Sequence, residues 1–100
     1  DQTMLTPAYA APEQLFDEYG SPDHRTDIFQ LGIVFYELFT GTHPYDGDAT
    51  QAIDQDIVPP SELNDALPSE IDSIITNTLS VEQTDRYQDV LNLRNDLSEQ

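Results

Sequence analysis

Cysteine, tryptophan and lysine are all absent from this sequence of 100 residues. Without cysteine, neither a disulfide nor thiolate chemistry is available. Apart from two histidines, the basic residues are three arginines, and they face twenty acids, so the formal net charge is -17. Such a charge repels nucleic acid, which is itself a polyanion, and disfavours docking on an anionic membrane. The composition therefore excludes nucleic acid as a partner.

Long apolar runs and a leader segment are missing as well. No stretch of about 18 apolar residues occurs, so the sequence predicts no membrane segment in this chain. The first residues, Asp1-Gln2-Thr3-Met4, lack the charged and then apolar layout of a secretion signal. The expected location is therefore the cytoplasm.

The acidity does not prevent a core. Leu, Ile, Val and Phe make up 25 of the 100 residues, which is above the level typical of disordered chains. The charge is even, with -8 over residues 1–50 (nine acids, one arginine) and -9 over residues 51–100 (eleven acids, two arginines). An acidic coat without lysine favours a high-salt cytoplasm, such as that of a haloarchaeon, because molar salt shortens the screening length to about 3 Å. An ordinary acidic domain is the alternative.

Turn-forming residues divide the chain, and the stretches between them have the character of helices. We expect helices over residues 11–16, 27–39, 49–57 (weak and polar), from Pro68 to about residue 79, and from about Tyr87 to Leu97. The fourth places Leu67, Ile71, Ile74, Ile75 and Leu79 on one face, and the fifth places Tyr87, Val90, Leu91, Arg94 and Leu97 on one face. No stretch alternates long enough to predict a strand, so the fold class is all-α.

The stretch from Asp27 to Phe39 is apolar on nearly every side. A helix of that kind either spans a membrane or lies at the centre of a large globule, and this one is too short to span. We therefore expect protein to surround it on all sides. Three other modest helices are too little to do so, which predicts that the chain is part of a larger domain.

Three motifs follow one another in the chain. They are Thr6-Pro7-Ala8-Tyr9-Ala10-Ala11-Pro12-Glu13, then residues 27–38 with Thr40-Gly41-Thr42-His43-Pro44-Tyr45, and then Leu79 with Asp85-Arg86-Tyr87 and the last helix. In this order they resemble the end of the activation segment, the central C-lobe helix and the last two helices of prokaryotic-type, eukaryotic-like Ser/Thr protein kinases. The resemblance covers nearly the whole chain.

This resemblance implies that residues 1–100 are a partial protein-kinase domain, running from the end of the activation segment to the last C-lobe helix, with the N-lobe and catalytic loop absent. The parent would transfer the γ-phosphoryl group of ATP, with Mg²⁺, to protein hydroxyls. Its partners would be protein substrates and the missing kinase half. This part would form the substrate-binding floor.

The chain on its own lacks the parts that phosphoryl transfer needs. It has no lysine, no Gly-rich loop and no Asp-Phe-Gly, so we expect it to bind no ATP, to contain no catalytic residue and to be inactive alone. A pseudokinase, or a truncated kinase-like scaffold for protein–protein interaction, is the alternative. A third alternative, an independent acidic helical module, would not explain why the 27–39 stretch is so apolar.

The resemblance also implies a buried ion pair between Glu13 and Arg86, which would clamp the activation segment onto the helical floor. A carboxylate and a guanidinium suit this task because they form two parallel hydrogen bonds. The alternative is that both are surface charges in an acidic chain.

Along the 27–39 stretch the resemblance implies roles for three further residues. Asp27 would hold the backbone of the catalytic loop, in addition to or instead of capping its own helix. Val34 and Leu38, one turn apart, would support the apolar stack beneath the adenine ring, or simply belong to the core.

Thr6 is the residue that the resemblance ties most closely to chemistry, since the matching threonine contacts the catalytic Asp and Lys. Tyr9 would pack the loop that faces the substrate beyond the phosphoacceptor. Glu37 would meet a basic residue of the substrate, although a carboxylate at this place is common. For Thr3, an ordinary loop residue is favoured over a phosphorylation site, and Thr6 has an ordinary turn residue as its alternative.

Two patterns have simpler explanations. His24-Arg25-Thr26-Asp27 looks like a His-Arg-Asp catalytic loop, but it follows Ala-Pro-Glu, whereas the catalytic loop must precede it. The acids from Asp46 to Asp56 lack the spacing of an EF-hand, so no metal site is predicted.

Overall fold

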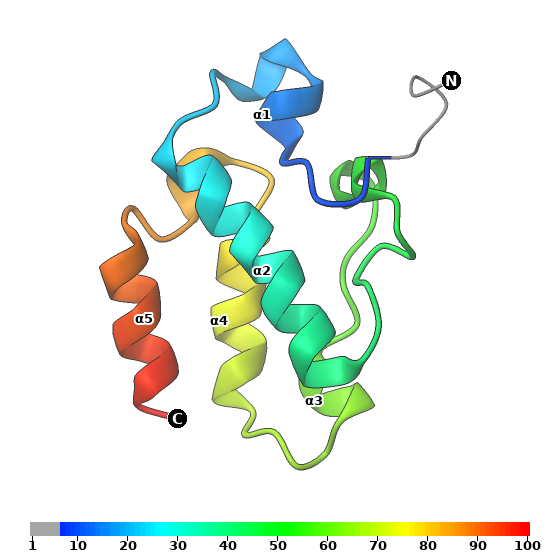
Figure 1. Cartoon of the computed structure of the whole chain (residues 1–100), viewed down its shortest axis with the longest axis vertical. Helices are drawn as coiled ribbons and strands as arrows, with labels where there is room; N and C mark the ends of the chain where they lie inside the picture. Colours follow the sequence, from blue (N-terminus) through cyan, green and yellow to red (C-terminus); the bar gives the residue numbers. More distant parts are fainter. Residues whose placement is uncertain (1–6) are drawn as a thin grey trace.

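The computed structural model describes residues 7–100, which form helices and connecting turns with no strand in that range. The α-helices are α1 (Pro12–Leu15), α2 (His24–Thr40), α3 (Pro60–Leu63), α4 (Glu70–Thr78) and α5 (Val90–Ser98), as Figure 1 shows. Three short 3-10 helices lie between them: η2 (Asp17–Tyr19), η3 (Ala49–Ile53) and η4 (Gln83–Asp85). The predicted all-α fold class is confirmed.

Helix α2 begins nearly one turn earlier than the apolar pattern predicts, because Asp23 caps it. The Asp23 carboxylate accepts a hydrogen bond from the Arg25 backbone N–H at 2.8 Å, and the Thr26 hydroxyl accepts one from the Asp23 N–H at 3.0 Å. This reciprocal arrangement is a capping box. Asp27 therefore lies inside the first turn, and its interpretation as the N-cap is wrong. The helix ends at Gly41, whose φ of 79° is left-handed.

One face of α2 packs against α4 and forms the centre of the core. Four large side chains on this face are at most 2% exposed: Ile28, Phe29, Ile33 and Tyr36. Gly32 lies where the two helices come closest, since a Cβ added there would be 2.5 Å from Thr78 Oγ1 and 2.9 Å from Leu79 Cδ2. A hydrogen at this position is what allows α2 and α4 to approach.

The face predicted for the fourth helix is confirmed in its main members. Ile71, Ile74 and Ile75 of α4 are buried, as is Leu79 directly after the helix. Leu67 is partly buried and packs against the same cluster. The periodicity works here because polar residues separate the apolar positions along the helix.

The predicted helix over 49–57 is wrong in length and type. Only Ala49–Ile53 is helical, as the 3-10 helix η3, and the Asp48 carboxylate caps it by accepting a hydrogen bond from the Thr50 N–H at 3.1 Å. Asp54 and Asp56 follow at the end where the helix dipole is negative, which disfavours continuation.

The last helix begins at Val90 rather than near Tyr87. Asp89 is its N-cap, with the carboxylate accepting a hydrogen bond from the Asn92 N–H at 3.0 Å. An extended cap residue starts a helix at the next position, so Tyr87 lies outside it.

The apolar face predicted for this last helix is also wrong in part. Leu93 is the buried residue, at 1% exposed, whereas Val90 and Leu91 are 49% and 54% exposed. Leu97 packs against the core from the same helix as Leu93. The helix therefore packs through Leu93 and Leu97, one turn apart, and not through Val90 and Leu91.

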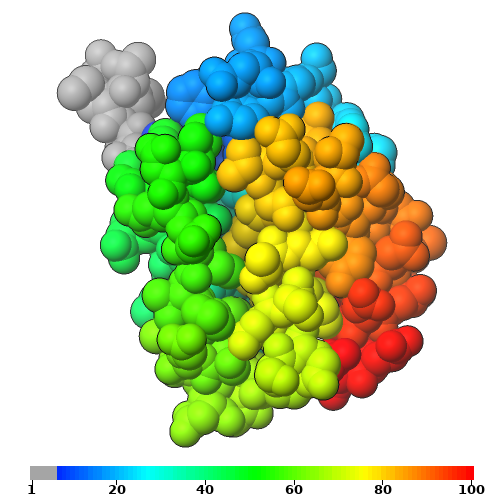
Figure 2. Space-filling model, turned by 180° about the vertical axis from the view of Figure 1, so that it is seen from behind, coloured from blue at the N-terminus to red at the C-terminus, as the bar shows by residue number. Residues whose placement is uncertain are grey.

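The other face of α2 is open, which fits the expectation that the helices of this chain are too few to surround it. Val34 and Leu38 are 40% and 73% exposed. Figure 2 shows the opposite side of the molecule. Three parts of the chain lie side by side there: the segment that follows α2, helix α4, and the C-terminal part. Within residues 7–100 the cover of α2 is therefore one-sided. No helix in this range is long and apolar enough to cross a bilayer.

Candidate functional site

Two segments 73 residues apart meet in a buried ion pair. Arg86 Nη1 donates to Glu13 Oε2 at 2.7 Å, and Nη2 donates to Oε1 at 2.8 Å. Neither side chain is exposed to solvent. The two parallel bonds use the planar fork of the guanidinium, which an ammonium group does not have. These are the two residues for which the sequence resemblance implies a pair.

Arg86 uses its remaining donors on backbone carbonyls. Its Nε donates to Ser80 O at 2.8 Å, its Nη1 to Arg25 O at 3.0 Å and its Nη2 to Val81 O at 3.1 Å. Together with the two bonds to Glu13, this engages all five N–H donors of a guanidinium. One side chain thus joins α1, the beginning of α2 and the turn after α4.

Thr26 completes the surroundings of the Glu13 carboxylate. Its hydroxyl donates to Glu13 Oε2 at 2.7 Å, and Thr26 itself is 4% exposed. Burial alone would raise the pKa of Glu13, but the hydrogen bonds from Arg86 and Thr26 outweigh it, so the pKa lies below its ordinary value. Glu13 is therefore a carboxylate at neutral pH, as the ion pair requires.

The guanidinium of Arg86 also lies over an aromatic ring. Its Cζ is 5.0 Å from the centroid of the Phe29 ring, within the range of a cation–π contact. Phe29 is fully buried on the inner face of α2. The ion pair is thus bounded by apolar packing on one side and by backbone carbonyls on the other.

Residues 7 and 8 lie along the turn that follows α2. Pro7 O accepts a hydrogen bond from the Ala49 N–H at 2.8 Å, and Ala8 O is 2.6 Å from His43 Nε2. His43 Nδ1 accepts a bond from the Tyr45 N–H at 2.9 Å. Because Nδ1 is an acceptor, the proton of a neutral ring is on Nε2, which donates to Ala8 O. The histidine therefore fixes this segment to the turn.

Tyr9 connects the same segment to α2. Its hydroxyl donates to Glu37 Oε1 at 2.7 Å, and its ring lies edge-on to His43 at 5.7 Å between centroids. This hydrogen bond to Glu37 is the main cause that raises the pKa of Tyr9, which keeps the hydroxyl protonated. The pair lies at the surface, so the Glu37 carboxylate is accessible to a cationic group.

The remaining candidates lie either on the open face of α2 or among residues 1–6, which are not among the described residues. Asp27 and Val34 line one shallow hollow together with Tyr9, whereas Leu38 is farther along the helix and largely exposed. Thr6 and Thr3 lie outside the described residues. The structure thus brings together Glu13 with Arg86, and Tyr9 with Glu37, and leaves Leu38 apart from both groups.

The sequence analysis missed two residues of this site. Thr26 could have been found from Asp23-x-x-Thr26, which has the spacing of a capping box. His43 had no partner pattern in the sequence, so no signal pointed to its contact with Ala8.

The residues of this site do not fit ATP and Mg²⁺. Arg86 is committed to Glu13, and Arg25 is paired with Asp23 at 2.8 Å, so neither is available for phosphate. Over residues 7–100, no group of three or more His, Asp or Glu side chains is placed to hold a metal ion. The His24-Arg25-Thr26-Asp27 run forms the first turn of α2, where the His24 ring is 2.6 Å from Gln88 O.

Comparison with known proteins agrees with this geometry. Residues 1–95 match the family described as the protein kinase domain. A probable serine/threonine-protein kinase of Clostridium perfringens is 33% identical over 102 residues, which cover 97% of this chain and 15% of that protein. The serine/threonine-protein kinases PknB and PknL of Mycobacterium tuberculosis are each 35% identical over 97 residues, covering 92% of this chain and 15% and 24% of those proteins.

The chain therefore spans at most 24% of the length of these relatives. Its match to the family nonetheless runs from residue 1 to residue 95, and the all-helical arrangement is consistent with the helical part of a kinase C-lobe. The chain belongs to the protein kinase domain family, and its relatives within it are Ser/Thr kinases.

Proposed function

We propose that residues 1–100 are the C-terminal part of the C-lobe of a Ser/Thr protein kinase and form the floor on which a protein substrate is bound. The parent enzyme would transfer the γ-phosphoryl group of Mg-ATP to protein hydroxyls. The observation that carries this proposal is the buried two-point bond between Glu13 and Arg86. It anchors α1, which directly follows the segment of residues 7–11, to the other helices, and this is the task that the family resemblance gives this pair.

The anchored segment also presents groups that suit a peptide. Pro7 and Ala8 are held against the turn after α2, so the backbone there has a defined position. Tyr9 and Glu37 reach the surface beside it. A substrate with a basic side chain would meet the Glu37 carboxylate, while Tyr9 orients that carboxylate. Thr6 would act just ahead of this segment, at the catalytic Asp and Lys of the missing half.

The open face of α2 supports a larger catalytic domain. Val34 and Leu38 are exposed apolar residues one turn apart, and Asp27 lies on the same helix nearer its start. An apolar helical face left in water favours a further protein layer. We infer that the missing kinase half covers this face. Asp27 would then hold the backbone of the catalytic loop, and Val34 and Leu38 would support the apolar stack beneath the adenine ring.

The nucleotide site must then be supplied by that missing half. ATP and Mg²⁺ would provide the phosphoryl group and its charge neutralisation when bound there. The chain described here contributes no lysine and no Gly-rich loop, so we expect it to be catalytically incompetent alone.

The charge supports a high-salt cytoplasm, such as that of a haloarchaeon. Twenty acids against three arginines repel one another strongly in dilute buffer. Molar salt removes most of that repulsion, because the screening length falls to about 3 Å. We expect circular dichroism to show more helix in molar KCl than in dilute buffer. Helix content that is insensitive to salt would count against this habitat.

The direct test is phosphoryl transfer by the full-length protein that contains this chain. With Mg-ATP and a basic protein substrate, we expect phosphoserine or phosphothreonine to form, whereas residues 1–100 alone should give none. The coding sequence upstream of Asp1 offers an independent check. A Gly-rich loop, a lysine strand, His-Arg-Asp and Asp-Phe-Gly there would support the enzyme, and their absence would reject it.

The second candidate is a pseudokinase or a truncated kinase-like scaffold. The exposed apolar residues on α2 and α5 favour it, because Leu38 and Leu91 suit protein–protein contact as well as an intramolecular layer. Nucleotide binding by the full-length protein distinguishes the two. Absence of ATP binding, with the fold intact, would select the scaffold.

A further inference from the structure

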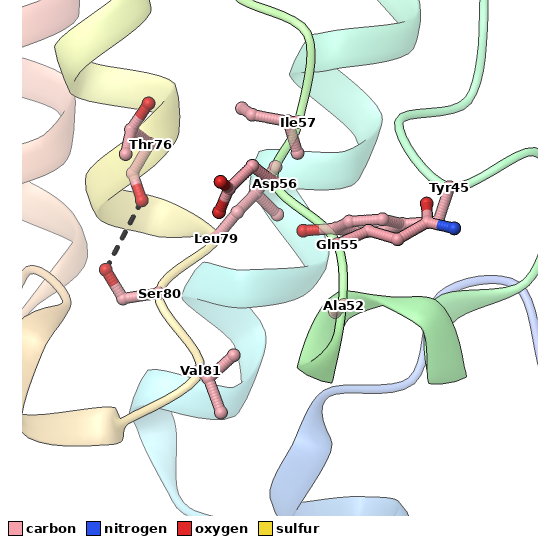
Figure 3. A pocket seen from close by; sticks show the side chains of 9 residues that line it. All are labelled: Tyr45, Ala52, Gln55, Asp56, Ile57, Thr76, Leu79, Ser80 and Val81. Carbon is pink, nitrogen blue, oxygen red and sulfur yellow. Dashed lines mark hydrogen bonds between the residues drawn. The ribbon is translucent and has the colours of Figure 1, made fainter.

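A cavity of about 190 Å³ lies between the segment around η3 and the end of α4. Figure 3 shows its nine lining side chains: Tyr45, Ala52, Gln55, Asp56, Ile57, Thr76, Leu79, Ser80 and Val81. These two parts of the chain lie side by side in Figure 2, on the side of the molecule away from α2. The cavity is therefore separate from the Tyr9 and Glu37 surface.

Tyr45 supplies the first sign that this cavity takes a ligand. It is only 3% exposed, and Figure 3 shows its side chain directed inward, with the hydroxyl at the inner end. Among residues 7–100 no hydrogen-bond partner satisfies this hydroxyl, in contrast to Tyr36, whose hydroxyl donates to Val58 O at 2.7 Å. In the described part of the chain no side-chain polar atom is both fully buried and unpartnered, so the Tyr45 hydroxyl oxygen itself faces the open space of the cavity, where an entering group can bond to it.

Asp56 supplies a carboxylate at the same cavity. Its side chain points toward the end of α4 in Figure 3, and within residues 7–100 it forms no ion pair. Two of the three arginines are held in ion pairs elsewhere, Arg86 with Glu13 and Arg25 with Asp23. Asp56 is exposed, so its carboxylate is open to a cationic group that arrives from outside the chain.

The surroundings strengthen the preference for a positive charge. The pKa of Tyr19 is raised by burial and by three nearby carboxylates, those of Glu18, Glu82 and Asp54. These three acids therefore lie close together on the surface around Tyr19. Asp54 and Glu82 are each within two residues of the cavity lining. The field at the mouth therefore attracts cations and repels phosphate and other anions.

The walls between these polar groups are apolar. Ala52, Ile57, Leu79 and Val81 contribute methyl and methylene surface to the cavity. At about 30 Å³ for each water, 190 Å³ holds about six waters, or a side chain of comparable size. An apolar stem with a flat cationic end matches this combination, and arginine has that form.

We propose that this cavity binds the arginine side chain of a partner protein segment, with its guanidinium between the Asp56 carboxylate and the Tyr45 hydroxyl. Asp56 accepts charge-assisted hydrogen bonds, and the hydroxyl oxygen of Tyr45 accepts a further one. The apolar walls cover the methylene stem. Arginine is favoured over lysine because its fixed planar donors reach both acceptors at once. The site does not depend on the proposed phosphoryl transfer.

Peptide binding to the full-length protein tests this site. The probes are a glycine-rich peptide with one arginine, and the same peptide with citrulline, which keeps the shape and loses the charge. Saturation-transfer difference NMR at one fixed KCl concentration gives both dissociation constants. We expect the citrulline peptide to bind at least about tenfold more weakly, and a lysine peptide about threefold more weakly.

Two variants locate the binding. Asp56→Asn should weaken the arginine peptide about tenfold, and Tyr45→Phe about threefold, because the ring stays and only the hydroxyl is lost. Asp65→Asn is the matched control, since Asp65 is an exposed acid that does not line the cavity and should leave the affinity unchanged. Thermal melts confirm that each variant is folded.

Three results would overturn the proposal. Equal binding of the arginine and citrulline peptides would remove the role of charge. Equal losses for Asp56→Asn and Asp65→Asn would show diffuse attraction to an acidic surface. A lysine peptide as tight as the arginine peptide would reject the planar, multi-donor recognition. Each is independent of whether the parent protein is an active kinase.

Discussion

Both faces of α2 carry apolar residues, but the two faces differ entirely in what they contact. On the inner face, Phe29 lies under the Arg86 guanidinium and Gly32 touches the end of α4. On the outer face, Val34 and Leu38 reach solvent. The inner face is packed within this chain, and the outer face is where we propose that a further protein layer binds.

The difference teaches that apolar character alone does not locate a core. What marks the inner side as complete is polar satisfaction, because every donor of Arg86 has an acceptor there. Among residues 7–100, no comparable network surrounds Leu38 on the outer side. Changes on the inner side should therefore affect the folding of this chain, and changes on the outer side should affect its assembly with the rest of the protein.

Breaking the ion pair should have the largest effect. Glu13→Gln leaves the Arg86 guanidinium buried without its counter-charge, so we expect the free energy of unfolding to fall by about 3–5 kcal/mol in urea titrations. Arg86→Lys should act similarly, because an ammonium cannot bond to five acceptors in one plane. Asp23→Asn is the control: it removes a more exposed ion pair with Arg25 and still caps α2, with a loss of at most about 1 kcal/mol. Equal losses would contradict the role of burial.

Crowding the contact between α2 and α4 should come next. In Gly32→Ala the new methyl group meets Thr78 and Leu79 at distances that force a shift, and we expect a loss of about 1–3 kcal/mol. Thermal unfolding measures it. Leu38→Ala, on the outer face of the same helix, is the matched control and should change little. If Gly32→Ala left the thermal stability unchanged, α2 and α4 would have to be farther apart at this position than the distances to Thr78 and Leu79 indicate.

Acid should weaken the inner side selectively. Burial raises the pKa of Glu13, but the hydrogen bonds from Arg86 and Thr26 outweigh this and hold the pKa below its ordinary value of 4.5. The unfolded chain then binds this proton more tightly than the folded chain. The stabilisation is therefore complete above pH 4.5 and is lost as the pH falls through the lower, folded pKa. Urea midpoints across this range measure the loss, and Glu13→Gln should lack this component.

A smaller effect on stability is expected at the Tyr9 and Glu37 pair, which lies at the surface. Tyr9→Phe should lower the free energy of unfolding by less than about 1 kcal/mol. In the full-length protein, Glu37→Gln should raise KM for a substrate with a basic residue severalfold and leave KM for a neutral substrate unchanged. An equal change for both substrates would argue against direct contact.

The smallest effect on this chain is expected at the outer face. Leu38→Ser should change the free energy of unfolding of residues 1–100 in concentrated KCl by no more than about 0.5 kcal/mol. In the full-length protein the same substitution should cost several times more, because a covered leucine is then lost. The same small change in both would mean that nothing covers this face.

Much of this arrangement could be predicted from the sequence. Apolar spacing identified α4, since Ile71, Ile74 and Ile75 repeat at helical intervals between polar residues. The residues of the Glu13 and Arg86 pair came from a resemblance to known motifs. No local pattern links positions 73 residues apart.

The errors have local causes. The start of α5 depends on which acid becomes the cap, and a chain with twenty acids offers many candidates. Asp89 takes that role, so Tyr87 lies outside the helix. Which face of α5 is buried depends on its packing against α4, and this places Leu93 inward and Val90 and Leu91 outward. Contacts such as the one between His43 and Ala8 join two turns, and turns have no periodicity from which to predict them.

The sequence separations of the Arg86 bonds predict an order in which these bonds form during folding. Ser80 and Val81 are six and five residues away, so these bonds can form as soon as the turn before η4 closes, whereas the bond to Glu13 must close a loop of 73 residues. The entropic cost of loop closure rises with loop length. We expect local carbonyls to orient the guanidinium first and Glu13 to arrive late, so Glu13→Gln should speed unfolding more than it slows refolding. The pair then governs how long the folded state lasts rather than how quickly it is reached.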